Sequence, residues 1–174
     1  MRIKVMFCLL MMVPALLLAA KAKKSLAGPL ASAEHWSTAD AASLTQEMAS
    51  AMREINPQDS RNLARVGELQ LRAGQAAEAA KTFAMALESD KKDDEACRII
   101  AVAYRDKGVW DKADEWFGKA TTLDPQDLDH QVEWAVSYWK RGDRKKAAEM
   151  MMKALAAEPE TERLYYKFGL GISH

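Results

Sequence analysis

Cysteine, proline and glycine are scarce in this 174-residue chain, which contains 2, 5 and 8 of them respectively. Two cysteines are too few for a disulfide scaffold. Low glycine and proline content, together with abundant alanine, favours helices over sheets. Histidine is also rare, and His35 and His130 have no ligand residues at metal-binding spacing. We therefore expect both histidines to be solvated, and we expect no metal and no cofactor.

The chain also lacks an excess of charge of either sign, because it has 25 basic and 25 acidic side chains. A dedicated nucleic-acid-binding protein carries a basic excess, so that class is disfavoured. The sequence contains no nucleophile motif, no glycine-rich phosphate loop and no isolated acid pair, which argues against an enzyme. A hydrophobic fraction of 49% and a charged fraction of 29% exclude a disordered chain and a polytopic membrane protein.

Long hydrophobic runs are absent except near the N-terminus, where Val5 to Ala20 is apolar and follows Arg2 and Lys4. A basic start followed by an apolar run is typical of a secretory signal. As a helix, the run would be about 24 Å long, shorter than the ~30 Å hydrocarbon core of a membrane. We interpret residues 1–27 as a signal peptide and expect the remaining chain to be exported to the periplasm.

A retained membrane anchor is the alternative for this segment. Lys21, Lys23 and Lys24 directly follow the apolar run, and positive charge there resists translocation. The protein would then be anchored in the inner membrane, with its body in the periplasm and no other membrane contact. Residues 28–37 are small, polar and proline-containing, and they predict a linker.

The body of the chain repeats every 34 residues. Gly74, Gly108 and Gly142 keep this step. Four further series keep it too, the last interrupted by Lys91: Ala79, Ala113 and Ala147; Ala86, Ala120 and Ala154; Phe83, Phe117 and Met151; and Pro57, Pro125 and Pro159. A period of this length predicts stacked supersecondary units.

Each period contains two apolar helical stretches separated by the glycine. Glycine suits the left-handed residue that ends a helix, and proline suits the connection after the second helix. One helix pair cannot bury its apolar faces alone, whereas stacked pairs can. The pattern predicts helices over about 39–55, 60–73, 76–88, 94–107, 110–121, 128–141, 144–157 and 161–170. These helices define repeats at about 60–93, 94–127 and 128–161, followed by a terminal helix within 162–174.

The residue pattern within a period resembles the tetratricopeptide repeat. The second period reads Cys97, Ile100, Ala101, Tyr104, Ala113, Phe117, Ala120 and Pro125 at the family's characteristic positions. The resemblance covers about residues 38–174. It implies an all-α fold, a right-handed superhelical solenoid of helix-turn-helix repeats.

In this family the first helix of each pair lines a concave groove that binds a peptide or a partner helix. The resemblance therefore implies a non-catalytic protein-protein interaction adaptor or scaffold. Carrying over the groove positions gives Arg61, Glu68, Leu71, Arg72, Glu95, Arg98, Val102, Arg105, Val132, Val136, Trp139, Lys140, Arg163, Tyr166 and Leu170. The set predicts a ligand with acidic and apolar side chains or a free carboxylate. Alternatively, the arginines form a solvated face paired with neighbouring acids.

The resemblance extends to exported repeat proteins that help to assemble envelope machinery, so the expected partner belongs to an envelope complex. Another function is open at the C-terminus, where Tyr165, Tyr166, Phe168 and Leu170 form an apolar helix. Terminal helices of repeat arrays normally have a polar outer face. The alternative is therefore a structural, self-assembling module that forms homo-oligomers through this helix.

Overall fold

The computed structural model describes residues 32–159 and 161–173. The predicted signal peptide or anchor at residues 1–27 lies outside the described residues. The chain divides into two compact units, residues 1–39 and 40–174. None of the helices in the described ranges is long and apolar enough to cross a membrane.

The first unit contains, within its described residues, the short helix α1 (Ala33–Thr38). The side chain of Ser32 caps this helix by accepting a hydrogen bond from the His35 N–H at 3.4 Å. Glu34 lies in the first turn, where a negative charge is favourable. Part of the segment that the sequence predicts as a linker is therefore helical.

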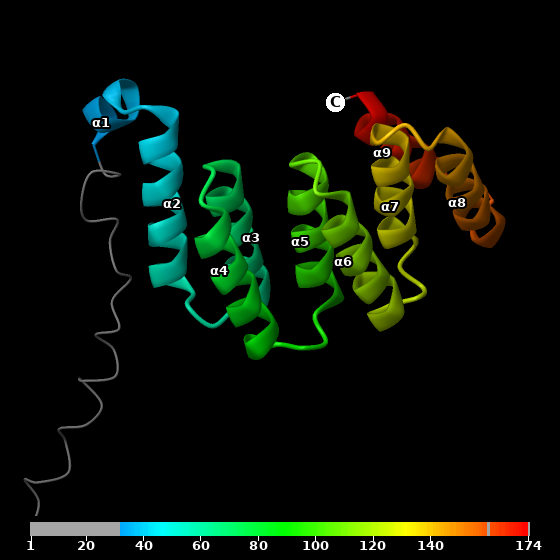
Figure 1. Ribbon diagram of the computed structural model, residues 1–174, viewed down its shortest axis with the longest axis horizontal. Helices are drawn as coiled ribbons and strands as arrows, with labels where there is room; N and C mark the ends of the chain where they lie inside the picture. Colours follow the sequence, from blue (N-terminus) through cyan, green and yellow to red (C-terminus); the bar gives the residue numbers. More distant parts are fainter. Residues whose placement is uncertain (1–31, 160, 174) are drawn as a thin grey trace, which may run out of the picture. The chain divides into compact units, whose positions relative to one another are not determined.

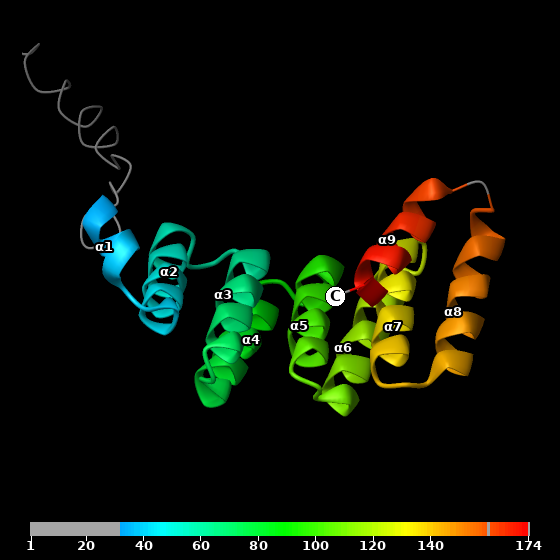
Figure 2. The same cartoon turned by 90° about the horizontal axis from the view of Figure 1, so that it is seen from above.

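The second unit is entirely helical in its described residues, with no strands. Three helical hairpins are preceded by one helix and followed by another that packs on α7, as Figures 1 and 2 show. The helices are α2 (Ala41–Ile55), α3 (Ser60–Arg72), α4 (Ala76–Ser89), α5 (Asp94–Asp106), α6 (Trp110–Leu123), α7 (Leu128–Lys140), α8 (Arg144–Ala157) and α9 (Glu162–Ser173). The predicted all-helical repeat fold is confirmed.

Each hairpin turns at one of the periodic glycines, which have φ angles of 82°, 70° and 94° at Gly74, Gly108 and Gly142. These angles lie in the left-handed region that a side chain disfavours. At the second turn, Gly108 N–H donates to the carbonyl of Arg105 at 2.8 Å, and Val109 N–H donates to that of Tyr104 at 3.0 Å. The other two turns close in the same way, which explains why the glycine recurs.

An aspartate begins the first helix of each hairpin. Asp59, Asp93 and Asp127 are the N-caps of α3, α5 and α7, and each side chain accepts a backbone N–H of the first turn, at 2.6, 3.1 and 2.8 Å. The carboxylate satisfies a backbone donor that has no partner within the helix and also lies at the positive end of the helix dipole. The caps keep the 34-residue step and fix where each repeat starts.

Both helices of each hairpin contribute to the core, and the second helices contribute their periodic residues. Phe83, Phe117 and Met151 are buried, and so are the alanines of both series. One cluster of buried side chains spans α3 to α6, and a second spans α7 to α9. Burying a side chain of this size contributes about 1.5–3 kcal/mol, so a few such residues per repeat account for the stacking.

Helices α3 and α4 approach one another closely at Gly67 of α3. A Cβ atom built there would lie 2.4 Å from the ring of Phe83 on α4. Gly169 of α9 stands three repeats later, at the equivalent position. A Cβ atom at Gly169 would have no heavy atom of the described residues within 4 Å, apart from its chain neighbours and its own helix backbone. Gly67 is therefore covered by α4, whereas no described helix covers Gly169 in the equivalent way.

Substituting these two glycines tests this difference. Gly67→Ala should lower the free energy of unfolding by about 1–3 kcal/mol, because the buried Phe83 ring must move. Gly169→Ala should raise it by about 0.5–1 kcal/mol, because alanine favours the helix and meets no obstruction. Urea unfolding followed by circular dichroism measures both changes. Shifts of the two midpoints in the same direction would contradict the packing described here.

Candidate partner-binding site

The fifteen residues expected to face a groove all lie on α3, α5, α7 and α9, the first helices of the hairpins together with the terminal helix. We call this set of helices the first-helix face. Tyr166, with 71% exposure, and Leu170, with 46%, are open to solvent on α9. Lys140 is exposed at the end of α7. These three side chains are available to a ligand.

Three of the apolar residues predicted for the groove are core residues instead. Val132 and Val136 are 0% exposed, and Leu71 is also buried. The reason is visible at Gly171 of α9, where a Cβ atom would lie 2.5 Å from the side chain of Val136. The backbone of α9 therefore presses directly on α7 and covers Val136, whereas Leu71 is buried in the core cluster of α3 to α6. Val102 is partly buried, packed against the first core cluster.

The predicted arginines are ion-paired, mostly with acids of the neighbouring first helix. Arg61 on α3 lies 3.0 Å from Asp93 of α5, and Arg72 lies 2.9 Å from Asp106. Further along the face, Glu133 of α7 lies 2.6 Å from Arg105 and 3.9 Å from Arg98, and Arg163 of α9 pairs with Asp129. These pairs form a ladder that crosses every boundary between adjacent first helices. The structure thus agrees with the alternative of a paired arginine face.

The acids of this ladder were not among the predicted site residues. Asp93, Asp106 and Asp129 each lie 32 to 34 residues from their arginine, which is about one period. That spacing is the signal that could have identified them in the sequence. Glu133, the partner of Arg105, is 28 residues away.

Arg98 and Glu95 form a tight pair within α5. The guanidinium donates two hydrogen bonds to the two carboxylate oxygens, at 2.7 and 2.6 Å. Burial acts to raise the pKa of Glu95, but the hydrogen bonds and the charge of Arg98 outweigh it, so the net pKa is lowered. The same hydrogen bonds raise the pKa of Arg98. Both groups are therefore held in one geometry and stay charged.

Trp139 contacts its own neighbours on both sides. The guanidinium of Arg144 lies 3.5 Å from the ring centroid, and the ring of Phe168 meets it edge-on at 5.8 Å. These contacts use the ring surface that we predicted for a ligand. On the first-helix face, Tyr166 is an aromatic side chain that is exposed to solvent.

The expectation that His130 is solvated is wrong. Its side chain is 0% exposed, and Nε2 lies 2.9 Å from Oδ2 of Asp94 on the neighbouring first helix. The sequence did not reveal this contact because the two residues are 36 positions apart and belong to different repeats.

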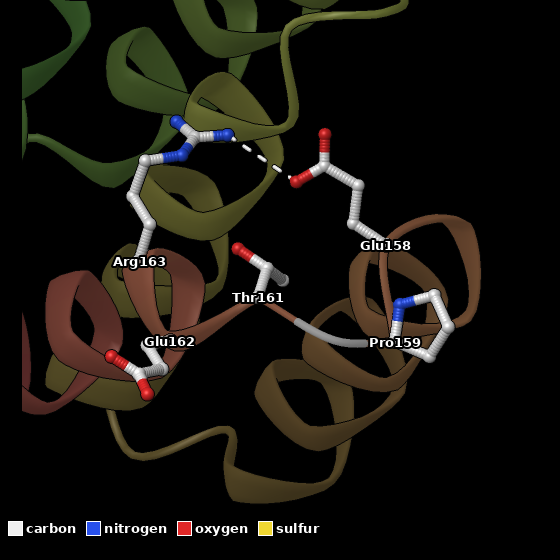
Figure 3. A pocket seen from close by; sticks show the side chains of 5 residues that line it. All are labelled: Glu158, Pro159, Thr161, Glu162 and Arg163. Atoms are coloured by element: carbon white, nitrogen blue, oxygen red, sulfur yellow. Dashed lines mark ion pairs between the residues drawn. The ribbon is translucent and has the colours of Figure 1, made fainter.

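An open pocket of about 690 Å³ lies at the connection between α8 and α9. Figure 3 shows its lining, with Arg163 and Glu158 facing one another across the opening at 3.6 Å. Thr161 lies between them, and Pro159 and Glu162 complete the wall. Because Arg163 is already paired with Asp129 and Glu158, the pocket offers a ligand little unpaired charge.

Comparison with known proteins identifies the repeat. Models of the tetratricopeptide repeat match residues 96–129 and 135–161. No curated protein matches the sequence. The chain is a tetratricopeptide-repeat protein, an all-helical array of protein-binding repeats from a scaffold family that is generally non-catalytic.

Three solved structures show the same fold at low sequence identity. The first is the crystal structure of YrrB, a TPR protein with an unusual peptide-binding site, with a TM-score of 0.54, 21% identity and coverage of 71% of this chain and 66% of that one. The second is Naa15/Naa10 bound to HypK-THB, with a TM-score of 0.53, 19% identity and coverage of 74% of this chain and 20% of that one. The third is MamA, with a TM-score of 0.52, 20% identity and coverage of 74% of this chain and 75% of that one. The chain thus spans less than two thirds of the length of the first two.

Low pH should weaken the ladder of ion pairs, because Asp93 becomes protonated. Burial acts to raise the pKa of Asp93, but hydrogen bonds from Ser60, Arg61 and the Ala96 N–H outweigh it, so the net pKa is lowered. A lowered pKa contributes stability above the unfolded value of about 3.9, and this stability is lost as pH falls through the folded value. Asp93→Asn keeps a capping oxygen but removes the charge, and should lower the free energy of unfolding by about 1–3 kcal/mol at pH 7.

Urea unfolding at several pH values between 7 and 3 measures this difference. The gap between wild type and Asp93→Asn should narrow below about pH 4, because the wild-type carboxylate becomes protonated. Asp111→Asn, at an exposed aspartate of α6, serves as the control and should change stability little. A gap that stays constant across the whole range would show that the charge of Asp93 is not what stabilises the fold.

Proposed function

We propose that this protein is a non-catalytic adaptor that acts outside the cytoplasm and binds a peptide or partner helix on the first-helix face. The observation that carries the proposal is the arrangement of the arginines. Arg61, Arg72 and Arg163 are each about half exposed, yet each is held by an acid of a neighbouring helix of the face. A guanidinium has five N–H donors, so one ion pair leaves donors for a ligand. Ordering these long side chains in advance lowers the entropy lost on binding.

The ligand that suits this face carries carboxylates and apolar groups. Carboxylates can add to the outward N–H groups of the half-exposed arginines, which bind such groups in a bidentate fashion. Tyr166 and Leu170, one turn apart on α9, provide an exposed apolar contact. YrrB, described as having an unusual peptide-binding site, supports a peptide as the kind of ligand.

Export rests on the N-terminal segment alone. A basic start, an apolar run of sixteen residues and small residues near position 27 support a signal peptide, whereas the lysines that follow support an anchor. In both cases the repeat array works in the periplasm, on a protein of an envelope complex. N-terminal sequencing of the mature chain separates the two, since a chain that still begins at Met1 rejects cleavage.

The binding role predicts which side chains matter. The triple variant Arg72→Ala, Arg163→Ala and Tyr166→Ala should capture its partner from envelope extracts with at least about tenfold lower affinity, since 1.4 kcal/mol suffices for that factor. Pull-down followed by mass spectrometry measures the loss.

Lys81→Ala and Lys119→Ala are the matched controls, because these lysines are exposed, ion-paired and located on the second helices α4 and α6. Thermal unfolding checks that all the variants remain folded. If the triple variant captured the same partners in the same amounts as wild type, the first-helix face would not be the binding surface.

A second candidate function is self-assembly through α9. Tyr165, Tyr166 and Leu170 are exposed on this helix, and Gly169 lies open between them. In the first repeat the equivalent glycine is covered by Phe83 of the paired second helix. The apolar side of α9 therefore has the character of an internal repeat interface and could pack against a second copy.

Sedimentation velocity tests this alternative on the proposed mature chain, residues 28–174. Self-assembly predicts that the fraction of dimer increases with protein concentration up to the high micromolar range. Leu170→Lys should abolish the dimer. Met152→Lys, which changes an exposed methionine on α8, should leave the dimer intact. A strict monomer throughout that range excludes this function.

A further inference from the structure

Two equivalent junctions join the N-terminal ends of successive first helices, and they differ in charge. At the first junction, between α3 and α5, Ser60 Oγ donates a hydrogen bond to Oδ2 of Asp93 at 2.5 Å. Nε of Arg61 lies 3.0 Å from both carboxylate oxygens of the same residue. One carboxylate thus faces one hydroxyl donor and one cation, and its charge is neutralised.

The second junction, between α5 and α7, replaces both of these partners with acids. Thirty-four residues after Ser60, Arg61 and Asp93 stand Asp94, Glu95 and Asp127. Glu95 forms an ion pair with Arg98. Neither Asp94 nor Asp127 pairs with an arginine or lysine among the residues that the structure describes. Two carboxylates therefore meet where the first junction has a carboxylate and a hydroxyl.

A buried histidine lies between these two carboxylates. His130 stands at the position of Ala96, one period later. Its Nε2 lies 2.9 Å from Oδ2 of Asp94 and 3.7 Å from Oδ2 of Asp127, and one ligand atom from each of the three residues lies within 4.8 Å of the others. Nδ1 has no hydrogen-bond partner among the described residues. Among the described residues, the carboxylates are thus the hydrogen-bond acceptors of a fully buried ring. Without a metal, Nε2 carries the proton that it donates to Asp94, and binding of a metal at Nε2 requires the tautomer with the proton on Nδ1.

We propose that Asp94, Asp127 and His130 form a binding site for a divalent transition-metal ion of the zinc type. Nε2 of His130 and the Oδ2 atoms of the two aspartates would be the ligands, with the imidazole proton on Nδ1. Tetrahedral zinc at about 2.0–2.2 Å from each ligand places ligand atoms about 3.4 Å apart, which the 2.9 and 3.7 Å separations bracket. The double positive charge would offset two carboxylates that form no ion pair with an arginine or lysine of the described residues.

The donor set selects the class of metal. Calcium and magnesium prefer sites made only of oxygen ligands, whereas imidazole nitrogen suits zinc and its neighbours. Three protein ligands leave a fourth position for water or a partner's side chain. The side chains of Asp94 and Asp127 are 27% and 35% exposed, so this position faces the solvent.

The metal would act as a clip between the second and third repeats. Asp94 belongs to α5, whereas Asp127 and His130 belong to the start of α7. The first helices α3 and α5 pack closely, but α7 packs mainly against α8 and α9 and touches α5 much less. A metal ion at this point would therefore fix the spacing of α5 and α7. The site stands independently of the proposed partner binding.

Two substitutions remove the ligands and install residues that the chain already has at the first junction. Asp94→Ser restores the residue type of Ser60, and His130→Ala restores that of Ala96. Both should therefore fold. His35→Ala is the control, because it removes a histidine of the first unit and leaves the proposed site intact.

The experiment is zinc titration of the full-length, chelator-treated chain by isothermal calorimetry, with metal content checked after dialysis. Wild type and His35→Ala should bind one zinc ion per chain at least tenfold more tightly than Asp94→Ser or His130→Ala. Zinc should also raise the thermal midpoint of wild type, and calcium should not. No zinc-induced shift in wild type, equal binding by wild type and Asp94→Ser, or an equal response to calcium would each overturn the proposal. The thermal measurement on wild type decides the matter even if a variant fails to fold.

Discussion

The interaction on which the whole array depends is the seating of one large side chain of each second helix on a small residue of its own first helix. Phe83 does this at Gly67, where the two helices approach so closely that even a Cβ atom would collide. Phe117 and Met151 stand at the same position in the following repeats and are equally buried. Because a large buried residue recurs every 34 residues, each hairpin gains an apolar wall that its neighbour can cover.

Apolar periodicity leaves the polar junctions between repeats free to differ. An aspartate N-cap and a glycine turn recur in each repeat, although Asp127 accepts the N–H two residues on whereas Asp59 and Asp93 accept the N–H three residues on. Within this recurring pattern, the first junction has a serine and an arginine around one carboxylate, whereas the second has a histidine between two. A difference in function between repeats can therefore arise from two or three side chains without disturbing the core.

The 34-residue period predicted the turns and the buried side chains that recur in each repeat. It did not predict contacts that depend on how closely two helices pack. The turns at Gly74, Gly108 and Gly142 and the buried aromatic series follow from local chemistry, which a single period displays. Whether Val136 faces a ligand or a helix depends instead on how closely α9 lies on α7, and no local pattern encodes that distance. The burial of His130 was missed for the same reason, since its partner Asp94 lies in another repeat.

The first-helix face consists of two halves that meet at the second junction. One core cluster unites α3 to α6, and the other unites α7 to α9, where α9 reaches Asp129 of α7 through Arg163 and Lys167. Polar links across the boundary include Arg105 with Glu133, the longer contact of Arg98 with Glu133, the cluster around His130, and Asp114 of α6 with Trp134 and Arg141. A ligand that spans both halves would sense their spacing, because its contacts on each half must be made together. Together with the packing of α6 on α7, whatever occupies the second junction therefore contributes to the geometry of the face without touching the ligand itself.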